Sequence, residues 1–319
     1  MVYKSPVMCD ILERCGRIAR KDKDVPFLIL GETGVGKNVL ANYIHEQTPG
    51  RCCHRFVEAC LSRDDNLLDS ALFGYRQGAY TGAYRNHDGA FALAEGGSIF
   101  LNEIGDISPQ GQFKLLKVLD DWQYLPVGGN DYIETDVRVI AATNKPIEYL
   151  MEGTHFRSDL YYRLSAELVT IPPLRERLED IIPLAEYFVD EWNQYHQTTY
   201  VLGENDVSLL MEYSFPGNAR ELKHIVESTA RWSGERFNTQ YLSGKLIPKK
   251  INIAPVSVNT SEPVLLTLEE FHCKTEYGYI KRCLDSTNYN ISQTAKILGI
   301  TRSTLRNKMK YHGLNEVSD

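Results

Sequence analysis

One short segment limits the fold of this chain more than any other: an apolar strand pattern that runs into a glycine-rich loop and then a helix. Residues 25–30 (VPFLIL) form a continuous apolar run, which is typical of a strand buried in a parallel sheet. The loop that follows is Gly31-Glu32-Thr33-Gly34-Val35-Gly36-Lys37. Its glycines allow a tight turn whose backbone N–H groups surround phosphate oxygens, and the helix N-terminus adds a favourable field. We therefore expect Lys37 to reach the terminal phosphates of a nucleotide. The alternative is a glycine-rich turn that merely begins a helix, and the strand–loop–helix setting disfavours it.

Apolar runs alternate with helical periodicity over the first half of the chain. Residues 7–22 have apolar side chains at helical spacing, and short buried-strand patterns recur at 98–101 and 137–142. Strands that alternate with helices predict an α/β fold with a parallel sheet covered by helices on both faces.

The second half has a different pattern. From Pro172 to Lys249 it is helical without a clear strand. Residues 247–264 contain three prolines and small polar residues, which is typical of a linker. We therefore predict an α/β domain over 1–172, a helical domain over 173–246, a linker over 247–264 and a small all-α domain over 265–319.

The charge of the chain is unevenly distributed. The whole chain carries a net charge of −7, which by itself disfavours nucleic acid as a partner because phosphate binding needs positive charge. Residues 281–312 nevertheless hold seven basic side chains against one acidic side chain, so this segment carries +6 and the rest carries −13. A small basic module joined to an acidic body predicts that the module alone binds DNA.

The basic module contains a helix, a glycine turn and a second helix over residues 290–310. Ala295 is small where two helices must approach, Gly299 permits the turn, and Leu305 and Met309 are expected to face inward. This spacing is typical of a helix-turn-helix, whose second helix contacts base edges and phosphates; the alternative is a basic, solvated helix face. The residues that we predict to contact DNA are Arg302, Ser303, Thr304, Arg306, Asn307, Lys308 and Lys310.

Composition also bears on the compartment. No apolar run approaches the ~18 residues that a membrane helix needs, and the first residues lack an apolar signal segment. The seven cysteines are an odd number without a C-x-x-C pair, which disfavours a disulfide framework and fits a reducing cytosol. We therefore expect a cytoplasmic protein with no membrane partner.

Two polar residues, Asn102 and Glu103, follow the apolar run at 98–101. In nucleotide hydrolases this strand end carries a carboxylate that holds Mg²⁺ and a second residue that orients the attacking water. Asn102 offers only an uncharged amide oxygen, a weak Mg²⁺ ligand, whereas Glu103 keeps a carboxylate that can orient water. Nucleotide binding and nucleotide hydrolysis are therefore separate predictions for this chain.

Taken with further segments, these motifs make the chain similar to the AAA+ domain of NtrC-type bacterial enhancer-binding proteins, followed by a Fis-type helix-turn-helix. The residues 72–74 (LFG) and the loop Gly78-Ala79-Tyr80-Thr81-Gly82-Ala83 resemble the family segment that contacts sigma-54. Thr143-Asn144 resembles sensor I, residues 156–164 (FRSDLYYRL) resemble the arginine-finger segment, residues 172–177 (PPLRER) resemble the start of the helical lid, and residues 217–222 (GNAREL) resemble sensor II.

The resemblance implies roles for individual residues. Asn144 and Arg220 would lie near the nucleotide with the phosphate loop and Asn38, while Arg157 and Arg163 would reach a nucleotide across a subunit interface. An arginine finger given in trans links hydrolysis to oligomerisation. The family uses ATP with Mg²⁺, contacts RNA polymerase holoenzyme and forms ring hexamers. Residues 268–285 resemble its dimerisation helix, and a dimer predicts paired DNA half-sites roughly 34 Å apart or a multiple of that distance.

Several positions depart from the family pattern. The family has Asp at the position of Asn102 and often Glu at that of Asn38, and Tyr80 adds a hydroxyl where its sigma-54 loop has Phe. The family strand after the phosphate loop carries an Asn that restrains the catalytic glutamate, and here Ala59 or Cys60 stands in its place. We expect nucleotide binding with reduced hydrolysis, and weakened or lost coupling to sigma-54.

Two functions remain open. The first is a regulator that uses a nucleotide as a conformational ligand and recruits polymerase without remodelling it; the departures resemble a branch of the family that senses cyclic di-GMP and controls biofilm or flagellar genes. The second is an ATP-hydrolysing, sigma-54-dependent activator that works as a hexamer, which Lys37, Glu103, Arg157 and Arg163 favour. Family members usually carry an N-terminal receiver or sensor domain, and we expect none within this sequence.

Overall fold

The computed structural model describes residues 2–61, 64–234, 237–246, 284, 291–297, 300 and 302–311. The chain divides into two compact units, Met1–Lys249 and Lys250–Asp319. The predicted linker over 247–264 lies outside the described residues, as do Gly299 and nearly all of the predicted dimerisation helix.

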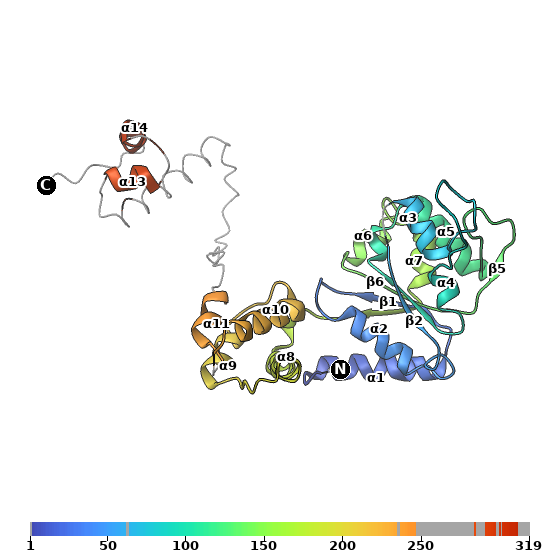
Figure 1. Ribbon diagram of the computed structural model, residues 1–319, viewed down its shortest axis with the longest axis horizontal. Coiled ribbons are helices and arrows are strands. Elements are labelled where there is room, and N and C mark those ends of the chain that lie inside the picture. The colour runs from blue at the N-terminus through green and yellow to red at the C-terminus, as the bar shows by residue number, and fades with distance from the viewer. Residues whose placement is uncertain are drawn as a thin grey trace, which may run out of the picture. The chain divides into compact units, whose positions relative to one another are not determined.

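The first unit is built on a parallel sheet, as the sequence predicted. Five strands of the described residues lie side by side in the order β2-β3-β6-β1-β7 (Figure 1). They are β1 (Phe27–Leu30), β2 (Phe56–Cys60), β3 (Ser98–Asn102), β6 (Arg138–Thr143) and β7 (Glu167–Thr170). The register pairs Leu30 with Thr143 and Cys60 with Asn102. Because parallel strands end at the same edge, the segments that follow β1, β3 and β6 meet there.

Helices cover both faces of this sheet. One face packs against α1 (Pro6–Lys21) and α2 (Lys37–Glu46), and the other against α3 (Asp65–Phe73), α4 (Ala90–Leu93), α5 (Pro109–Asp121) and α7 (Ser158–Leu164). Alternate residues of β1 enter the two cores: Phe27 and Ile29 face α1 and α2, while Leu28 and Leu30 face the opposite core.

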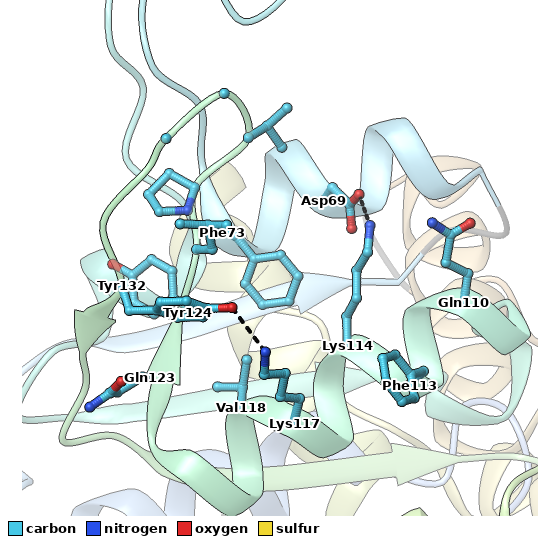
Figure 2. A pocket seen from close by; sticks show the side chains of 15 residues that line it. Asp69, Phe73, Gln110, Phe113, Lys114, Lys117, Val118, Gln123, Tyr124 and Tyr132 are labelled. Carbon is cyan, nitrogen blue, oxygen red and sulfur yellow. Dashed lines mark hydrogen bonds and ion pairs between the residues drawn. The ribbon is translucent and has the colours of Figure 1, made fainter.

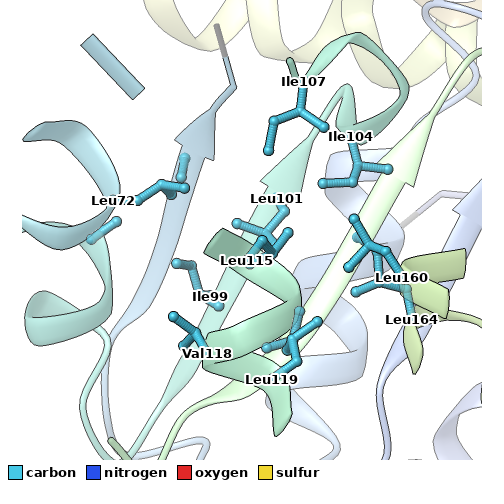
Figure 3. Packing of buried hydrophobic residues seen from close by; sticks show 14 of the residues in the cluster. Leu72, Ile99, Leu101, Ile104, Ile107, Leu115, Val118, Leu119, Leu160 and Leu164 are labelled. Carbon is cyan, nitrogen blue, oxygen red and sulfur yellow. The ribbon is translucent and has the colours of Figure 1, made fainter. Parts of the chain in front are cut away.

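The α5 side of the core shows why these strands are apolar throughout. Figure 3 shows Leu115, Val118 and Leu119 of α5 packed near Ile99 and Leu101 of β3. Full burial of one such side chain contributes roughly 1.5–3 kcal/mol to folding. A short helix, α6 (Ile147–Met151), and the two-stranded pair β4 (Gln123–Tyr124) and β5 (Ile133–Glu134) complete this part of the unit.

A helical lid follows the sheet within the same unit. It begins with the 3₁₀ turns η2 (Leu174–Glu176) and η3 (Leu178–Asp180) and continues through α8 (Ile181–His196), α9 (Glu204–Met211), α10 (Asn218–Arg231) and α11 (Thr239–Lys245). Fully buried Phe215 and Leu222 lie in its separate core. The buried carboxylate of Asp180 accepts a hydrogen bond from the Ser5 hydroxyl at 2.8 Å, so the start of the lid is tied to the start of the chain.

The second unit contains α13 (Ile291–Ile297) and α14 (Arg302–Tyr311). Ala295, Leu305 and Met309 are buried together with Leu284, which confirms the predicted inward-facing positions. In the part of the chain that the structure describes, no helix has both the length and the apolar character to cross a membrane.

Candidate nucleotide-binding site

The phosphate loop joins β1 to α2, and its glycines adopt conformations that other residues rarely reach. Gly34 has φ +82° and Gly36 has φ +108°. A Cβ at Gly34 would lie 2.3 Å from the carbonyl oxygen of Gly217 and 3.0 Å from Cβ of Arg220. Gly34 is therefore required both for the backbone turn and for the close approach of the lid.

Lys37 begins α2 and is largely buried. Its Nζ donates to the Gly31 carbonyl at 2.9 Å and lies 3.7 Å from Oε1 of Glu103. Burial lowers the pKa of Lys37, and the Glu103 carboxylate opposes that shift. The amine thus lies at the centre of the loop, where it can interact with terminal phosphates.

Glu103 follows β3 in a left-handed conformation with φ 56°. The backbone N–H of Asn144 donates to its Oε2 at 3.3 Å, and the Asn144 side chain donates to the Thr33 hydroxyl at 3.3 Å. The predicted water-orienting acid and the predicted sensor I residue are therefore brought together beside the phosphate loop.

Two neighbouring cavities extend from this loop. One, of about 410 Å³, is lined by Lys37, Asn38, Asn102, Glu103 and Arg220 among others, so it gathers residues predicted from distant parts of the sequence. The other, of about 250 Å³, is mainly apolar; its lining includes Val2, Met8, Val35, Leu184, Tyr187, Phe188 and Ala219. A polar cavity beside an apolar one suits the phosphates and base of a nucleotide. The apolar cavity cannot be predicted from the sequence, because no local pattern connects residues 2–8 with α8.

Hydrogen bonds and an ion pair hold the lid against the phosphate loop. Arg175 donates to both carboxylate oxygens of Glu32, at 2.6 and 2.9 Å. The fully buried Asn218 donates to Glu32 and to the Thr33 carbonyl, both at 3.1 Å, and accepts from the Leu174 N–H at 2.8 Å. Hydrogen bonds from Arg175 and then Asn218 lower the pKa of Glu32 to about 2. The loop and the lid therefore share a continuous set of hydrogen bonds.

A group of three polar side chains lies at the end of β3. Glu58 of β2 accepts hydrogen bonds through Oε1 from Nδ2 of Asn38 at 2.8 Å and from Nδ2 of Asn102 at 3.0 Å. Oδ1 of Asn102 is buried without a hydrogen-bond partner among the described residues. Amide and carboxylate oxygens are ligands that Mg²⁺ commonly takes in proteins. The group therefore fits a Mg²⁺ ion that is bound together with nucleotide phosphates.

The structure shows where Ala59 and Cys60 lie, the two residues that could stand in place of the family's Asn on β2. Ala59 is buried in the core on the α3–α5 side. Cys60 pairs in register with Asn102 at the strand end. The sequence pattern does not identify Glu58 as a site residue. Its only local signal is a carboxylate two residues before the end of β2, and this signal has meaning only once β2 is known to pair with β3.

The two predicted arginine fingers do not line the cavity at the phosphate loop. Arg157 precedes α7 and forms an ion pair with Asp159 at 2.7 Å. Arg163 donates to the Leu119 carbonyl at 2.6 Å and lies 3.5 Å from Asp120. Both side chains remain partly exposed, at 45% and 43%.

The segment Gly78–Ala83 forms a turn whose tip is exposed. Gly78 and Gly82 have positive φ, the Tyr80 side chain is 49% exposed, and its ring meets the edge of Tyr75. A Cβ at Gly128 would lie 2.7 Å from Cβ of Ala79, so this turn rests on the β4–β5 connection.

Beside that connection lies a further cavity of about 530 Å³, lined by residues of α3 and α5 and by residues 123–129 and 132. Figure 2 shows Lys114 directed toward Asp69 and Lys117 toward the Tyr132 hydroxyl. Both lysines are thus engaged within the unit, and the cavity does not include any phosphate-loop residue.

The predicted DNA-contacting residues lie on α14. Arg302, Ser303 and Thr304 are exposed at its N-terminal end, and Lys308 is partly exposed. Backbone positions of Arg306, Asn307 and Lys310 lie on the same helix, while their side chains lie outside the described set. The exposed first turn is the part of a recognition helix that contacts base edges.

Comparison with protein families gives three consecutive matches. Residues 1–170 match the sigma-54 interaction domain, residues 175–259 the AAA+ ATPase lid domain, and residues 274–312 the Fis family of bacterial regulatory proteins.

Curated relatives match over much of the chain. The hydrogenase transcriptional regulatory protein HoxA of Cupriavidus necator is 41% identical over 96% of this chain and 64% of its own length. The Nif-specific regulatory protein of Klebsiella pneumoniae is 45% identical over 72% of this chain and 44% of its own length. The chain thus spans less than two thirds of the length of these relatives.

Solved structures agree with the fold. NtrX from Brucella abortus in complex with ADP superposes with a TM-score of 0.71 at 28% identity, covering 98% of this chain and 69% of that protein. The same protein in complex with ATP gives a TM-score of 0.70 at 30% identity.

Proposed function

The chain belongs to the family of bacterial transcriptional regulators that carry a sigma-54 interaction domain, and we propose that it binds DNA through α14 and ATP at the phosphate loop. We further propose that Asn102 makes its ATP hydrolysis slow. The observation that supports ATP binding is the placement of Lys37, Glu103 and Arg220 along one polar cavity, with the Asn144 N–H bonded to Glu103.

In this proposal each part of the cleft has its own task. The backbone of the phosphate loop and Lys37 hold the phosphates, and Arg220 reaches them from the lid. The apolar cavity excludes water around the base. Mg²⁺, held with the phosphates by the oxygens of Asn38 and Asn102, would supply neutralising charge.

Glu103 would orient the attacking water, and Asn144 would hold that carboxylate in place. The weak element is Asn102, because an amide lacks the charge of a carboxylate at the strand end. We therefore expect a site that binds ATP well and turns it over slowly.

Steady-state ATPase measurements on the wild type and on Asn102→Asp test this proposal. We expect low turnover by the wild type and about a tenfold increase in Asn102→Asp, on the order of 1.4 kcal/mol of transition-state stabilisation. The added substitution Lys37→Ala in the Asn102→Asp variant should abolish that increase. This result would show that the added turnover takes place at the phosphate loop. Vigorous turnover by the unmodified chain would overturn slow hydrolysis.

A second candidate function is an ATP-hydrolysing activator that remodels RNA polymerase holoenzyme with sigma-54 as a hexamer. The observation that favours it is the retained acid Glu103, held beside Lys37, together with two exposed arginines outside the chain's own cleft. Measurement of ATPase activity against protein concentration distinguishes the two functions, because fingers given in trans make turnover rise steeply on assembly.

We also propose a homo-oligomer, at least a dimer, that engages RNA polymerase and paired DNA half-sites, with cyclic di-GMP as a regulatory ligand. The dimer and the ligand rest on the family resemblance; arginine side chains would stack on guanine and clamp phosphates. Calorimetric titration with cyclic di-GMP should show saturable binding. If no binding heat were measured at micromolar concentrations, cyclic di-GMP would not be a ligand of this protein.

A further inference from the structure

One carboxylate, that of Glu58, lies between the side-chain amides of Asn38 and Asn102. Asn38 belongs to α2, Asn102 ends β3, and Glu58 lies on β2, yet the Glu58 Oε1 atom is 2.8 Å from one amide nitrogen and 3.0 Å from the other. The two amides are themselves 3.5 Å apart, from Nδ2 of Asn102 to Oδ1 of Asn38. The three side chains thus form one compact group.

The charges of this group differ from those that phosphoryl chemistry usually requires. A strand-end carboxylate commonly holds Mg²⁺ beside the phosphates, but Asn102 is neutral, and so is Asn38. The carboxylate within hydrogen-bond reach of both amides comes from the neighbouring strand, two residues before its end. Parallel pairing of β2 with β3 makes this possible, because it sets Glu58 beside Phe100 and Cys60 beside Asn102.

We propose that Glu58 supplies the negative charge for the Mg²⁺ of the bound nucleotide, in place of a carboxylate at position 102. This role rests on the proposed ATP binding. The two amide N–H groups position Glu58, because each donates to its Oε1. With its nitrogen directed to Glu58, Asn102 keeps a buried Oδ1 that lacks a partner among the described residues, and a cation would satisfy that acceptor.

A simpler role for the group is an exposed hydrogen-bond network that only links α2, β2 and β3. The amide oxygen of a glutamine can still accept both hydrogen bonds, so at this exposed position the change from Glu to Gln should cost folding little. The two roles therefore differ in what the change from Glu to Gln does to metal affinity, and not in what it does to folding.

Mn²⁺ titration monitored by electron paramagnetic resonance tests the proposal, with a non-hydrolysable ATP analogue at saturation. Glu58→Gln should weaken Mn²⁺ binding about tenfold or more, the range found when residues around a metal are changed. Affinity for the analogue in EDTA should stay unchanged or rise slightly, because a negative charge near the phosphates is removed.

A matched control and a rescue variant sharpen this test. Glu46 of α2 is also exposed and also accepts a hydrogen bond from an asparagine amide, Nδ2 of Asn42 at 2.7 Å; Glu46→Gln should leave Mn²⁺ affinity unchanged. The double variant Glu58→Gln/Asn102→Asp returns the charge to β3 and should restore Mn²⁺ affinity, which a purely structural Glu58 would not allow.

The outcomes separate this role from the proposed function. If the wild type binds the analogue and Mn²⁺ while Glu58→Gln matches it within twofold, or binds Mn²⁺ more tightly, Glu58 has no such role and ATP binding stands. If the wild type binds no ATP analogue, both proposals fail together.

Discussion

The two sides of the nucleotide cleft are built differently. On the phosphate side, the glycine-rich loop, Lys37 and the lid are joined by hydrogen bonds that continue from Glu32 to Asn218. On the strand-end side, asparagines lie at the start of α2 and at the end of β3, and the carboxylate that accepts a hydrogen bond from each of them is on β2. The phosphate side has the glycine-rich loop and the lysine that commonly hold phosphates. The strand-end side has its negative charge on β2 and neutral amides on α2 and β3.

This difference shows how binding and hydrolysis can change separately. Phosphate binding depends on backbone N–H groups and one amine, which the loop provides locally. Nucleotide hydrolysis generally needs a metal, an acid and arginine fingers placed together, so we expect a neutral side chain at the metal position to slow hydrolysis while nucleotide binding is kept. Variants on the phosphate side should therefore affect binding or stability, and variants on the strand-end side should affect metal affinity and turnover.

The largest effect is expected at Lys37. Lys37→Ala removes the buried amine at the centre of the loop and should weaken ATP binding about 100-fold, on the order of 2.7 kcal/mol. Fluorescence titration with a labelled ATP analogue measures it, and Lys117→Ala on α5, outside this cleft, serves as the control. If the Lys37→Ala variant bound the ATP analogue within threefold of the wild type, Lys37 would not be part of the phosphate-binding side of the cleft.

A smaller effect is expected at Asn218, which joins the lid to the loop. Its φ is +56°, so Asn218→Gly removes the side chain without backbone strain and leaves the Leu174 N–H and the Thr33 carbonyl unpaired. We expect a loss of about 2 kcal/mol in the free energy of unfolding, measured by urea denaturation.

Gln197 offers a matched control for that substitution. It is exposed at the end of α8 with φ +54°, and Gln197→Gly should be neutral or slightly stabilising. Equal losses in the two glycine variants would mean that the Asn218 contacts do not hold the lid.

The smallest effect is a pH dependence at Glu32. Its pKa falls from 4.5 to about 2 in the folded chain because of Arg175 and then Asn218. A lowered pKa means that this stabilisation is present above about pH 4.5 and is lost as the pH falls toward 2. Since the pair is partly exposed, its contribution should stay below about 1 kcal/mol.

Comparison of wild type and Glu32→Gln by urea denaturation from pH 7 to pH 3 measures that dependence. The stability difference should be constant at neutral pH and narrow as the pH is lowered through 4.5. A difference that widens on acidification would contradict the assigned sign.

Much of the fold could be predicted because its signals are local. The phosphate loop, the apolar strands at 98–101 and 137–142, and the inward positions Leu305 and Met309 depend on neighbours within a few residues, where backbone geometry and periodicity act directly. The residues around the nucleotide were assigned by resemblance, and the structure brings Asn144 and Arg220 to the loop.

Local sequence patterns alone predict a phosphate loop in an α/β unit and a basic helix pair. The fold brings together the distant side chains that complete the cleft: Glu58 beside Asn102, Arg175 on Glu32, and Val2 with Phe188 around the apolar cavity. For Glu58 and Asn102 the cause is the strand order β2-β3-β6-β1-β7. That order places β2 next to β3 through long-range packing, and no local pattern along the chain encodes it.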